Sequence, residues 1–144
     1  ALNDETIMDD LLMEDTLAGR CGHHFHSYPK EFEMEIENKE TSPYLFRQTT
    51  LGFSLDQLVE LFDLKYPNHI KIDVDGNEEK IMNGALRIIS RPEVKSLGIE
   101  LYQTWRQGPY NNRVIETLKT LGFELVDEVK PNSGIPGNHL FLRS

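Results

Sequence analysis

The sequence predicts an α/β fold whose β-sheet is mostly parallel and ends in a C-terminal antiparallel hairpin. The second half of the chain alternates short apolar strands with amphipathic helices of about ten residues, a rhythm typical of βαβ units and a parallel sheet. The last two strands have no helix between them, so they are expected to pair antiparallel. With 144 residues, the chain has the length of one domain and can bury a core of its own.

The predicted core begins with a helix, a strand and a second helix. Ser54 is the expected N-cap of the helix LDQLVELF (55–62), in which apolar residues recur at i, i+3, i+4 and i+7. HIKIDV (69–74) is a short strand rich in β-branched residues. The second helix is expected over 77–90 and ends before Pro92, because a proline disfavours helical backbone in the residue before it.

Three further strands and one helix complete the predicted core. The strand SLGIELY (96–102) is followed by a loop over 105–112 and by the amphipathic helix RVIETLKTLG, which ends at Gly122 as a C′ glycine. The strands FELVDEV (123–129) and NHLFLRS (138–144) close the chain. The alternation of elements therefore places the α/β core in residues 51–144.

Residues 1–50 differ from this core in charge and pattern. They carry 11 acidic and 4 basic side chains, and no regular rhythm of helices and strands is visible in them. One exception is EFEMEIENKE (31–40), where apolar and acidic residues alternate with the period of a half-exposed strand. We therefore expect residues 1–50 to form an irregular, acidic insert or lid on the core.

Composition excludes several classes of function. The formal net charge of −9 argues against a protein that grips a nucleic-acid backbone. The apolar runs are too short for a transmembrane helix, and the first residues lack the basic and apolar regions of a signal peptide. A single cysteine excludes an internal disulfide and favours a reducing compartment, so a cytoplasmic location is expected.

One block of residues resembles a known family. The block begins with Leu55-Asp56 and continues with KIDVDG (71–76), Glu78 and Gly84-Ala85. In these residue types and offsets, and in SLGIELY and LGFELV further on, it resembles the FkbM-type methyltransferases, whose signature has glutamate where this chain has Asp75. The resemblance covers residues 1–4 and about 50–130, because the opening Ala1, Leu2, Asn3 and Asp4 also resemble the end of the family's third strand.

The resemblance implies a Rossmann-like class I methyltransferase sheet and S-adenosylmethionine as the methyl donor. It implies O-methylation of a small molecule or a sugar hydroxyl, with Ala1, Leu2, Asn3 and Asp4 near the adenine of the donor. However, no two of the ten glycines are spaced as G-x-G, so the family's glycine-rich donor loop is absent. The 144 residues are therefore expected to be a single partial domain without the N-terminal strands, to bind the donor weakly alone and to self-associate through the open sheet edge.

Asp73 is the leading candidate for the acceptor side of the reaction. It lies near the carboxyl end of a predicted parallel strand, where open α/β sheets bind ligands, and a carboxylate there can orient or deprotonate a hydroxyl or hold a divalent cation. The alternative is that Asp73 supports the following turn. Lys71 shares its face of the strand, as an acceptor-facing charge or as a structural ion pair. Glu78, in the first turn of the next helix, and Glu100, near the end of the next strand, are supporting candidates, although Glu78 can also simply stabilise its helix.

The acceptor pocket has candidates in two predicted loops. Tyr102 ends the strand at 96–102 on the same face as Glu100, and Trp105 follows in the loop, where an aromatic loop can line a pocket, although a loop tryptophan more often covers the core. His23, His24 and His26 are candidates for acceptor contact or proton transfer. Together with Cys21 they also suggest zinc, but four candidate ligands within six residues and no second cluster do not fit the usual spacing, so no metal site is predicted.

A second class of function stays open. The chain can instead be a non-catalytic interaction domain whose exposed central strand pairs with another chain, since an unpaired strand edge is a template for such pairing. The missing glycine-rich loop favours this alternative, and the KIDVDG block favours the enzyme.

Overall fold

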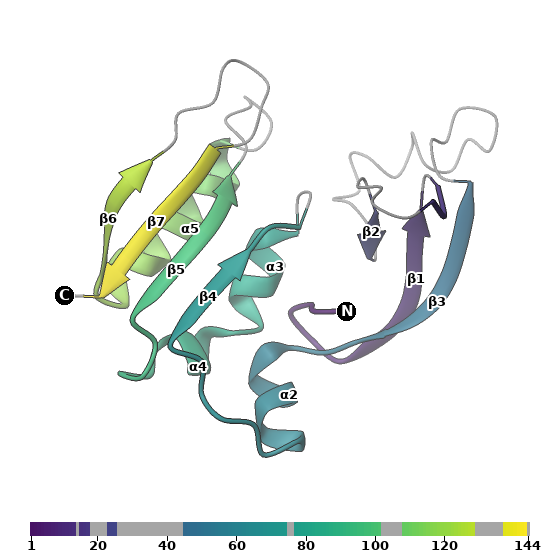
Figure 1. Cartoon of the computed structure of the whole chain (residues 1–144), viewed down its shortest axis with the longest axis horizontal. Coiled ribbons are helices and arrows are strands. Elements are labelled where there is room, and N and C mark those ends of the chain that lie inside the picture. Colours follow the sequence, from purple (N-terminus) through teal and green to yellow (C-terminus); the bar gives the residue numbers. More distant parts are fainter. Residues whose placement is uncertain are drawn as a thin grey trace.

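The computed structural model describes residues 1–13, 15–17, 23–25, 45–74, 77–101, 108–128 and 137–143. Two β-sheets make up the described part of the chain, a four-stranded sheet with helices and a smaller three-stranded sheet (Figure 1). The four-stranded sheet and its helices correspond to the predicted core, and the α/β class expected from the sequence is confirmed.

The four-stranded sheet has the order β4-β5-β7-β6. Its strands are β4 (His69–Ile72), β5 (Ser96–Leu101), β6 (Phe123–Glu128) and β7 (Gly137–Arg143). β4 and β5 are parallel, whereas β7 is antiparallel to both β5 and β6. The predicted antiparallel hairpin of the last two strands is confirmed, but the sheet is mixed and not mostly parallel. The reason is that β7 inserts between β5 and β6 instead of joining at an edge.

The helices differ from the prediction mainly at their ends. They are α2 (Leu55–Leu61), α3 (Glu78–Asn83), α4 (Leu86–Ile89) and α5 (Gly108–Thr120). Ser54 caps α2 as expected, because its hydroxyl accepts from the N–H of Gln57 at 3.2 Å. The single helix predicted over 77–90 is two helices, and α5 begins at Gly108, inside the predicted loop. Gly122 ends α5 with a φ of 83°, a left-handed backbone that glycine adopts without strain.

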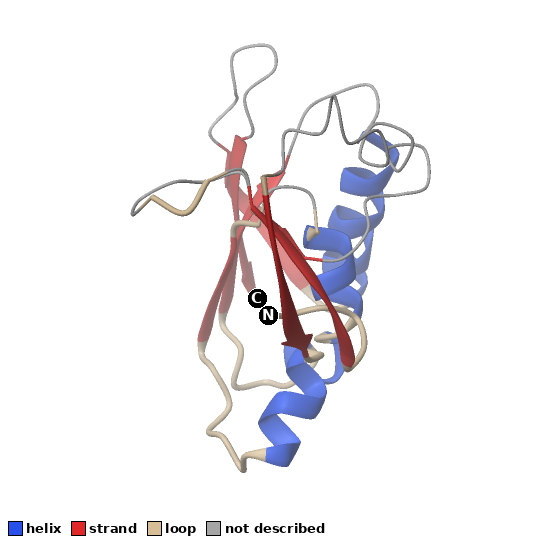
Figure 2. Ribbon diagram, turned by 90° about the vertical axis from the view of Figure 1, so that its right-hand side faces the viewer, coloured by secondary structure: helices blue, strands red, loops and turns tan. Residues whose placement is uncertain are grey.

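The core lies on one face of the four-stranded sheet. Side chains alternate along β5, so that Leu97, Ile99 and Leu101 are buried while the residues between them are more exposed. The buried face packs against α3 and α5, which supply Ile81, Met82, Val114 and Leu118 to the same cluster. Figure 2 shows helices gathered on one side of the strands. The opposite face of the sheet carries Lys71, Gly98 and Glu100 and is left uncovered by α3 and α5.

The smaller sheet lies almost entirely within residues 1–50, so its strands contradict the expectation of an irregular segment. It contains β1 (Ile7–Met13), β2 (His24–Phe25) and β3 (Phe46–Gly52) in the antiparallel order β2-β1-β3. β3, for example, carries charged and polar residues in its exposed part, and pairing with β1 forms the strand in spite of its weak apolar pattern. The strand predicted over 31–40 lies outside the described residues.

The N-terminal segment pairs with Phe53, which lies between β3 and α2. Leu2 forms a parallel bridge with Phe53, and the N–H of Asn3 donates to the Phe53 carbonyl at 2.8 Å. Asp56 in turn fastens α2 to α4, because its carboxylate accepts from the N–H groups of Arg87 and Ile88 at 3.0 and 2.9 Å. The Leu55-Asp56 pair of the family-like block thus has a structural role, as a cap on a neighbouring helix.

Candidate functional site

Four polar side chains lie together where β4 and β5 end. The register pairs Ile72 with Ile99 and Glu100 with Asn138, so Asp73, Glu100 and Asn138 follow one another across the sheet. Lys71 lies on the same uncovered face as Asp73. The carboxyl ends of parallel strands are where open α/β sheets bind ligands, and Figure 1 shows those of β4 and β5 at the same edge.

Lys71 and Asp73 form a direct ion pair. The Lys71 Nζ atom lies 2.6 Å from Asp73 Oδ2, and the two side chains are 64% and 44% exposed. The hydrogen bond from Lys71 lowers the pKa of Asp73, a second hydrogen bond with Glu100 lowers it further, and partial burial opposes both. Asp73 in turn raises the pKa of Lys71. The expected shared face is confirmed, and Asp73 is an ionised, solvent-reachable carboxylate at neutral pH.

Glu78 is more deeply placed than the other acidic candidates. It begins α3 and is 6% exposed, so its carboxylate belongs to the interior of this end of the molecule. An acid in the first turn of a helix favours the positive end of the helix dipole. This position supports the structural alternative for Glu78.

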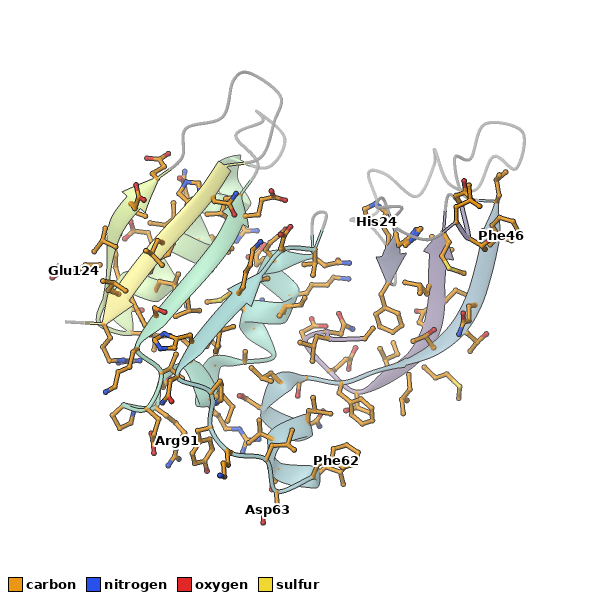
Figure 3. The ribbon with its side chains drawn as sticks, viewed as in Figure 1. His24, Phe46, Phe62, Asp63, Arg91 and Glu124 are labelled. Carbon is orange, nitrogen blue, oxygen red and sulfur yellow. The ribbon has the colours of Figure 1, made fainter. Side chains whose placement is uncertain are left out.

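The histidine-bearing strand β2 is tied to the same end of the molecule. The Nδ2 atom of Asn77, directly before α3, donates to the Phe25 carbonyl at 3.0 Å. His24 is 8% exposed and lies on β2, the edge strand of the small sheet on the side nearest β4 in this view (Figure 3). His23 has a buried Nδ1 atom without a hydrogen-bond partner among the described residues. The structure thus brings Phe25, the residue after His24, against Asn77 at the start of α3.

The opening residues lie beside the turn between α3 and α4. Asn3 is 2% exposed, and its Oδ1 atom is buried without a hydrogen-bond partner in the described parts of the chain. Asp4 is exposed, whereas Ala1 and Leu2 run alongside Phe53. A buried carboxamide oxygen without a hydrogen-bond donor is costly.

Several sequence candidates cannot be placed. His26, Tyr102, Trp105 and Cys21 lie outside the described residues. Across the ranges that are described, no three His, Cys, Asp or Glu side chains converge as in a metal site.

Sequence reasoning missed two polar residues of this region. Asn138 lies in the row of Asp73 and Glu100 only because β7 pairs with β5. Local sequence patterns do not predict that pairing. Asn77 follows the KIDVDG block directly and is the first residue of the predicted helix over 77–90, which gives no sign of a partner 52 residues away. Each needed the tertiary structure to reveal its neighbour.

Comparison with known proteins supports a methyltransferase family for the chain. Residues 17–125 match the family model described as the Methyltransferase FkbM domain, which covers most of the 144 residues and includes the KIDVDG block, Glu78 and Glu100. Residues 1–4, which resemble the end of the family's third strand, lie outside the matched range. Comparison with curated proteins and with solved structures gives no significant match.

The helices add one further observation. None of those in the described ranges has the length and the apolar character needed to cross a bilayer. The matched range of the family model includes the block around β4, which supplies the polar row at the sheet edge. The chain belongs to the FkbM methyltransferase family.

Proposed function

We propose that this domain transfers a methyl group from S-adenosylmethionine to a hydroxyl of a small molecule or a sugar. The observation that carries the proposal is the polar row of Asp73 and Glu100 at the carboxyl edge of β4 and β5, in a chain of a methyltransferase family. On this proposal the four-stranded sheet is part of a Rossmann-like methyltransferase sheet. A cytoplasmic location accords with the single cysteine.

Asp73 acts on the acceptor in this proposal. When bound, the donor supplies a methyl group on a positively charged sulfur, and the acceptor oxygen forms a bond to that carbon as the carbon–sulfur bond breaks. The acceptor hydroxyl donates a hydrogen bond to Asp73, which orients the oxygen and receives or passes on the released proton. Because the pKa of Asp73 is lowered, orientation is its larger contribution, and Lys71 keeps the carboxylate ionised. Glu100 supports Asp73 from β5, while Glu78 keeps a supporting place at the start of α3.

The opening residues fit the donor in one respect. The unpaired Oδ1 of Asn3 is a buried acceptor that matches the exocyclic amino group of an adenine, and Ala1, Leu2 and Asp4 flank it. The absence of a G-x-G pair from the chain argues for weak donor affinity, because such a loop brings backbone close to the donor. We therefore expect a dissociation constant for S-adenosylmethionine well above the low-micromolar range.

Acceptor contacts come from β2 and from the loop after β5 in the same proposal. His23 and His24 come just before Phe25, whose carbonyl Asn77 binds, and His26, Tyr102 and Trp105 are proposed as further acceptor contacts. Since the row of Asp73 and Glu100 is acidic, neutral hydroxyl compounds fit it better than phosphorylated ones.

A radiolabel assay tests the function. The full chain, at millimolar methyl-labelled S-adenosylmethionine, is offered a panel of neutral sugars, polyols and phenols, and labelled products are separated by chromatography. Label in an acceptor that is lost in Asp73→Asn and kept in Asp63→Asn, an exposed aspartate at the end of α2, supports the function. Equal incorporation by the wild-type chain and Asp73→Asn contradicts it.

A second candidate function has its own observation. Among the described strands β4 pairs only with β5, so its other edge presents free backbone groups that can accept a strand from another chain or a second copy. Light scattering over a tenfold range of concentration tests this pairing. Growth of the mass with concentration supports it, and a constant monomer mass contradicts it.

A further inference from the structure

Asn77 departs from the usual behaviour of an asparagine before a helix. At such a position the side-chain oxygen normally accepts from an N–H in the first turn. Asn77 has φ −99° and ψ 13°, and its side chain makes no capping hydrogen bond to α3. Its Nδ2 atom donates instead to the Phe25 carbonyl, 52 residues earlier in the chain, at 3.0 Å. The carboxamide therefore binds a distant backbone carbonyl instead of capping its own helix.

The backbone of Asn77 is fixed to the end of β4. Its N–H donates to the Val74 carbonyl at 3.1 Å, and its carbonyl accepts from the N–H of Ile81 at 3.0 Å. Asn77 is therefore held between the residue after Asp73 and the first turn of α3. Because its backbone is anchored at the end of β4, the Asn77 side chain fixes the position of the Phe25 carbonyl relative to that end.

The strand on the other side of this bond is short and carries the histidines. β2 has two residues, pairs only with β1 among the described strands, and so has few backbone bonds of its own. Phe25 is 7% exposed, and its ring fills the space over Gly52. The bond from Asn77 ties the Phe25 carbonyl directly to the residues between β4 and α3.

We propose that Asn77 is a positioning residue for the acceptor side of the site. By binding the Phe25 carbonyl it holds β2, and with it His23 and His24, beside the carboxyl end of β4 on the acceptor side of the site. The inference rests on the proposed methyl transfer for the identity of the ligand. The link between Asn77 and His23 is a separate statement about the structure and can be tested without any substrate.

The first test observes the histidine rings directly. Imidazole nitrogen spectra of the full chain are recorded for the wild type, Asn77→Ala and Asn77→Asp, with the His23 signal assigned by His23→Gln. Asn77→Asp keeps the shape, removes the donor and favours the helix terminus, so it should fold. We expect both variants to move the His23 signals and to speed amide exchange in β2 at least about fivefold, the effect of losing one neutral hydrogen bond. The signals of His69 and His139 should stay in place.

Asn68 provides the matched control. Its Nδ2 atom also donates to a backbone carbonyl, that of Glu93 at 2.8 Å, at the opposite end of β4. Asn68→Asp should leave the His23 signals unchanged. Unmoved His23 signals in Asn77→Asp, or equal movement in Asn68→Asp, would overturn the positioning role.

Kinetics provide the second test, using the labelled acceptor found in the panel assay. In Asn77→Ala we expect the KM for the acceptor to rise about fivefold with donor affinity unchanged, and Asn77→Gln, which retains the amide donor, to restore part of the loss. Equal losses in acceptor and donor binding would contradict positioning. If the wild-type chain transfers no methyl group but the His23 signal still moves in Asn77→Asp, the proposed function is overturned and the positioning role of Asn77 stands.

Discussion

The backbone carbonyl of Asn3 occupies the space that a Cβ atom on Gly84 would fill. Gly84 joins α3 to α4, and its own carbonyl accepts from the N–H of Asp56 at 3.0 Å. The glycine therefore lets the N-terminal segment and the start of α2 meet the turn between two helices. This contact gives a physical reason for the glycine of the family-like block.

Replacing Gly84 with alanine should undock the N-terminal segment. The new methyl group would meet backbone atoms of Asn3 and Asp4, which cannot move aside as a flexible side chain can. We expect a loss of about 1–3 kcal/mol in the free energy of unfolding. Urea denaturation measures the loss, and faster amide exchange at Asn3 would show that its bond to Phe53 has opened.

Gly98 is the matched control for this substitution. A Cβ atom there would meet only the Lys71 side chain at 4.0 Å, an ordinary contact. Gly98→Ala should therefore keep or slightly raise stability. If Gly84→Ala proves as harmless as Gly98→Ala, the close approach of Asn3 is wrong.

Asp56→Ala should destabilise the contact between α2 and α4. The carboxylate is 12% exposed on its side chain and accepts from two backbone N–H groups at the start of α4. We expect a cost of about 1–2 kcal/mol, the usual effect of losing a helix cap. Glu60→Ala is the control, because Glu60 binds Arg87 from an exposed position and should cost less than about 0.5 kcal/mol. Equal costs in urea denaturation would argue against capping by Asp56.

Arg143→Met should be among the most destabilising substitutions in the last strand. The guanidinium donates to the carbonyls of Ile89, Val94 and Leu121 at 2.6, 3.0 and 2.8 Å, and lies over the Phe123 ring. Methionine keeps the apolar stem but leaves three carbonyls unpaired, so we expect a loss of about 2–4 kcal/mol.

Arg113→Met is the control for charge alone. Arg113 binds Glu79 at 2.6 Å in an exposed ion pair on α5, and its loss should cost less than about 1 kcal/mol. Thermal unfolding of both variants side by side makes the comparison. A smaller shift for Arg143→Met than for Arg113→Met would show that the carbonyl contacts add little.

Asp73→Asn separates orientation of the acceptor from support of the local fold. The substitution keeps the shape and removes the charge from an exposed side chain. If Asp73 orients or deprotonates the acceptor, methyl transfer should fall by roughly 10²–10⁴-fold while the melting temperature changes little. The opposite pattern, a loss of about 1 kcal/mol in stability with normal turnover per folded molecule, would retire the catalytic assignment. Both quantities are to be measured on the same preparation.

The ion pair of Lys71 and Asp73 predicts how stability depends on pH. The pKa of Asp73 is lowered from 3.8, so its contribution is present above that value and is lost as the pH falls through the lowered pKa. The pKa of Lys71 is raised from 10.5, so its contribution is present below that value and is lost as the pH rises through the raised pKa. Between these limits the contribution is constant, and it is small because both groups are exposed.

Lys71→Met checks this dependence. It should raise the pKa of Asp73 toward 3.8, observed by carboxyl NMR, and the stability difference from the wild type should vanish in about 1 M salt. Lys65→Met, which removes an exposed charge elsewhere, should leave the Asp73 titration unchanged. An Asp73 pKa that is the same with and without Lys71 would contradict the ion pair.

The sequence by itself determined the elements that depend on near neighbours. The helix period in 55–62, the cap at Ser54 and the left-handed Gly122 are local effects of side-chain spacing and backbone freedom, and the structure confirms them. The KIDVDG block likewise determined the family, which the family match confirms over residues 17–125. Its Lys71 and Asp73 share a strand face because successive side chains of a strand alternate, and the observed ion pair follows.

Tertiary structure alone decided which distant segments meet. The sequence predicted the hairpin of β6 and β7 but not the insertion of β7 beside β5, since strand order depends on pairing across the sheet. The β1–β3 sheet was missed because strand formation in polar sequence depends on cross-strand partners. The break of the helix over 77–90 near Gly84 goes with the docking of Asn3 there, and Asn77 turned from its helix to Phe25 because that carbonyl came within reach. In each case the energy comes from contacts between residues far apart in the chain, which local periodicity does not record.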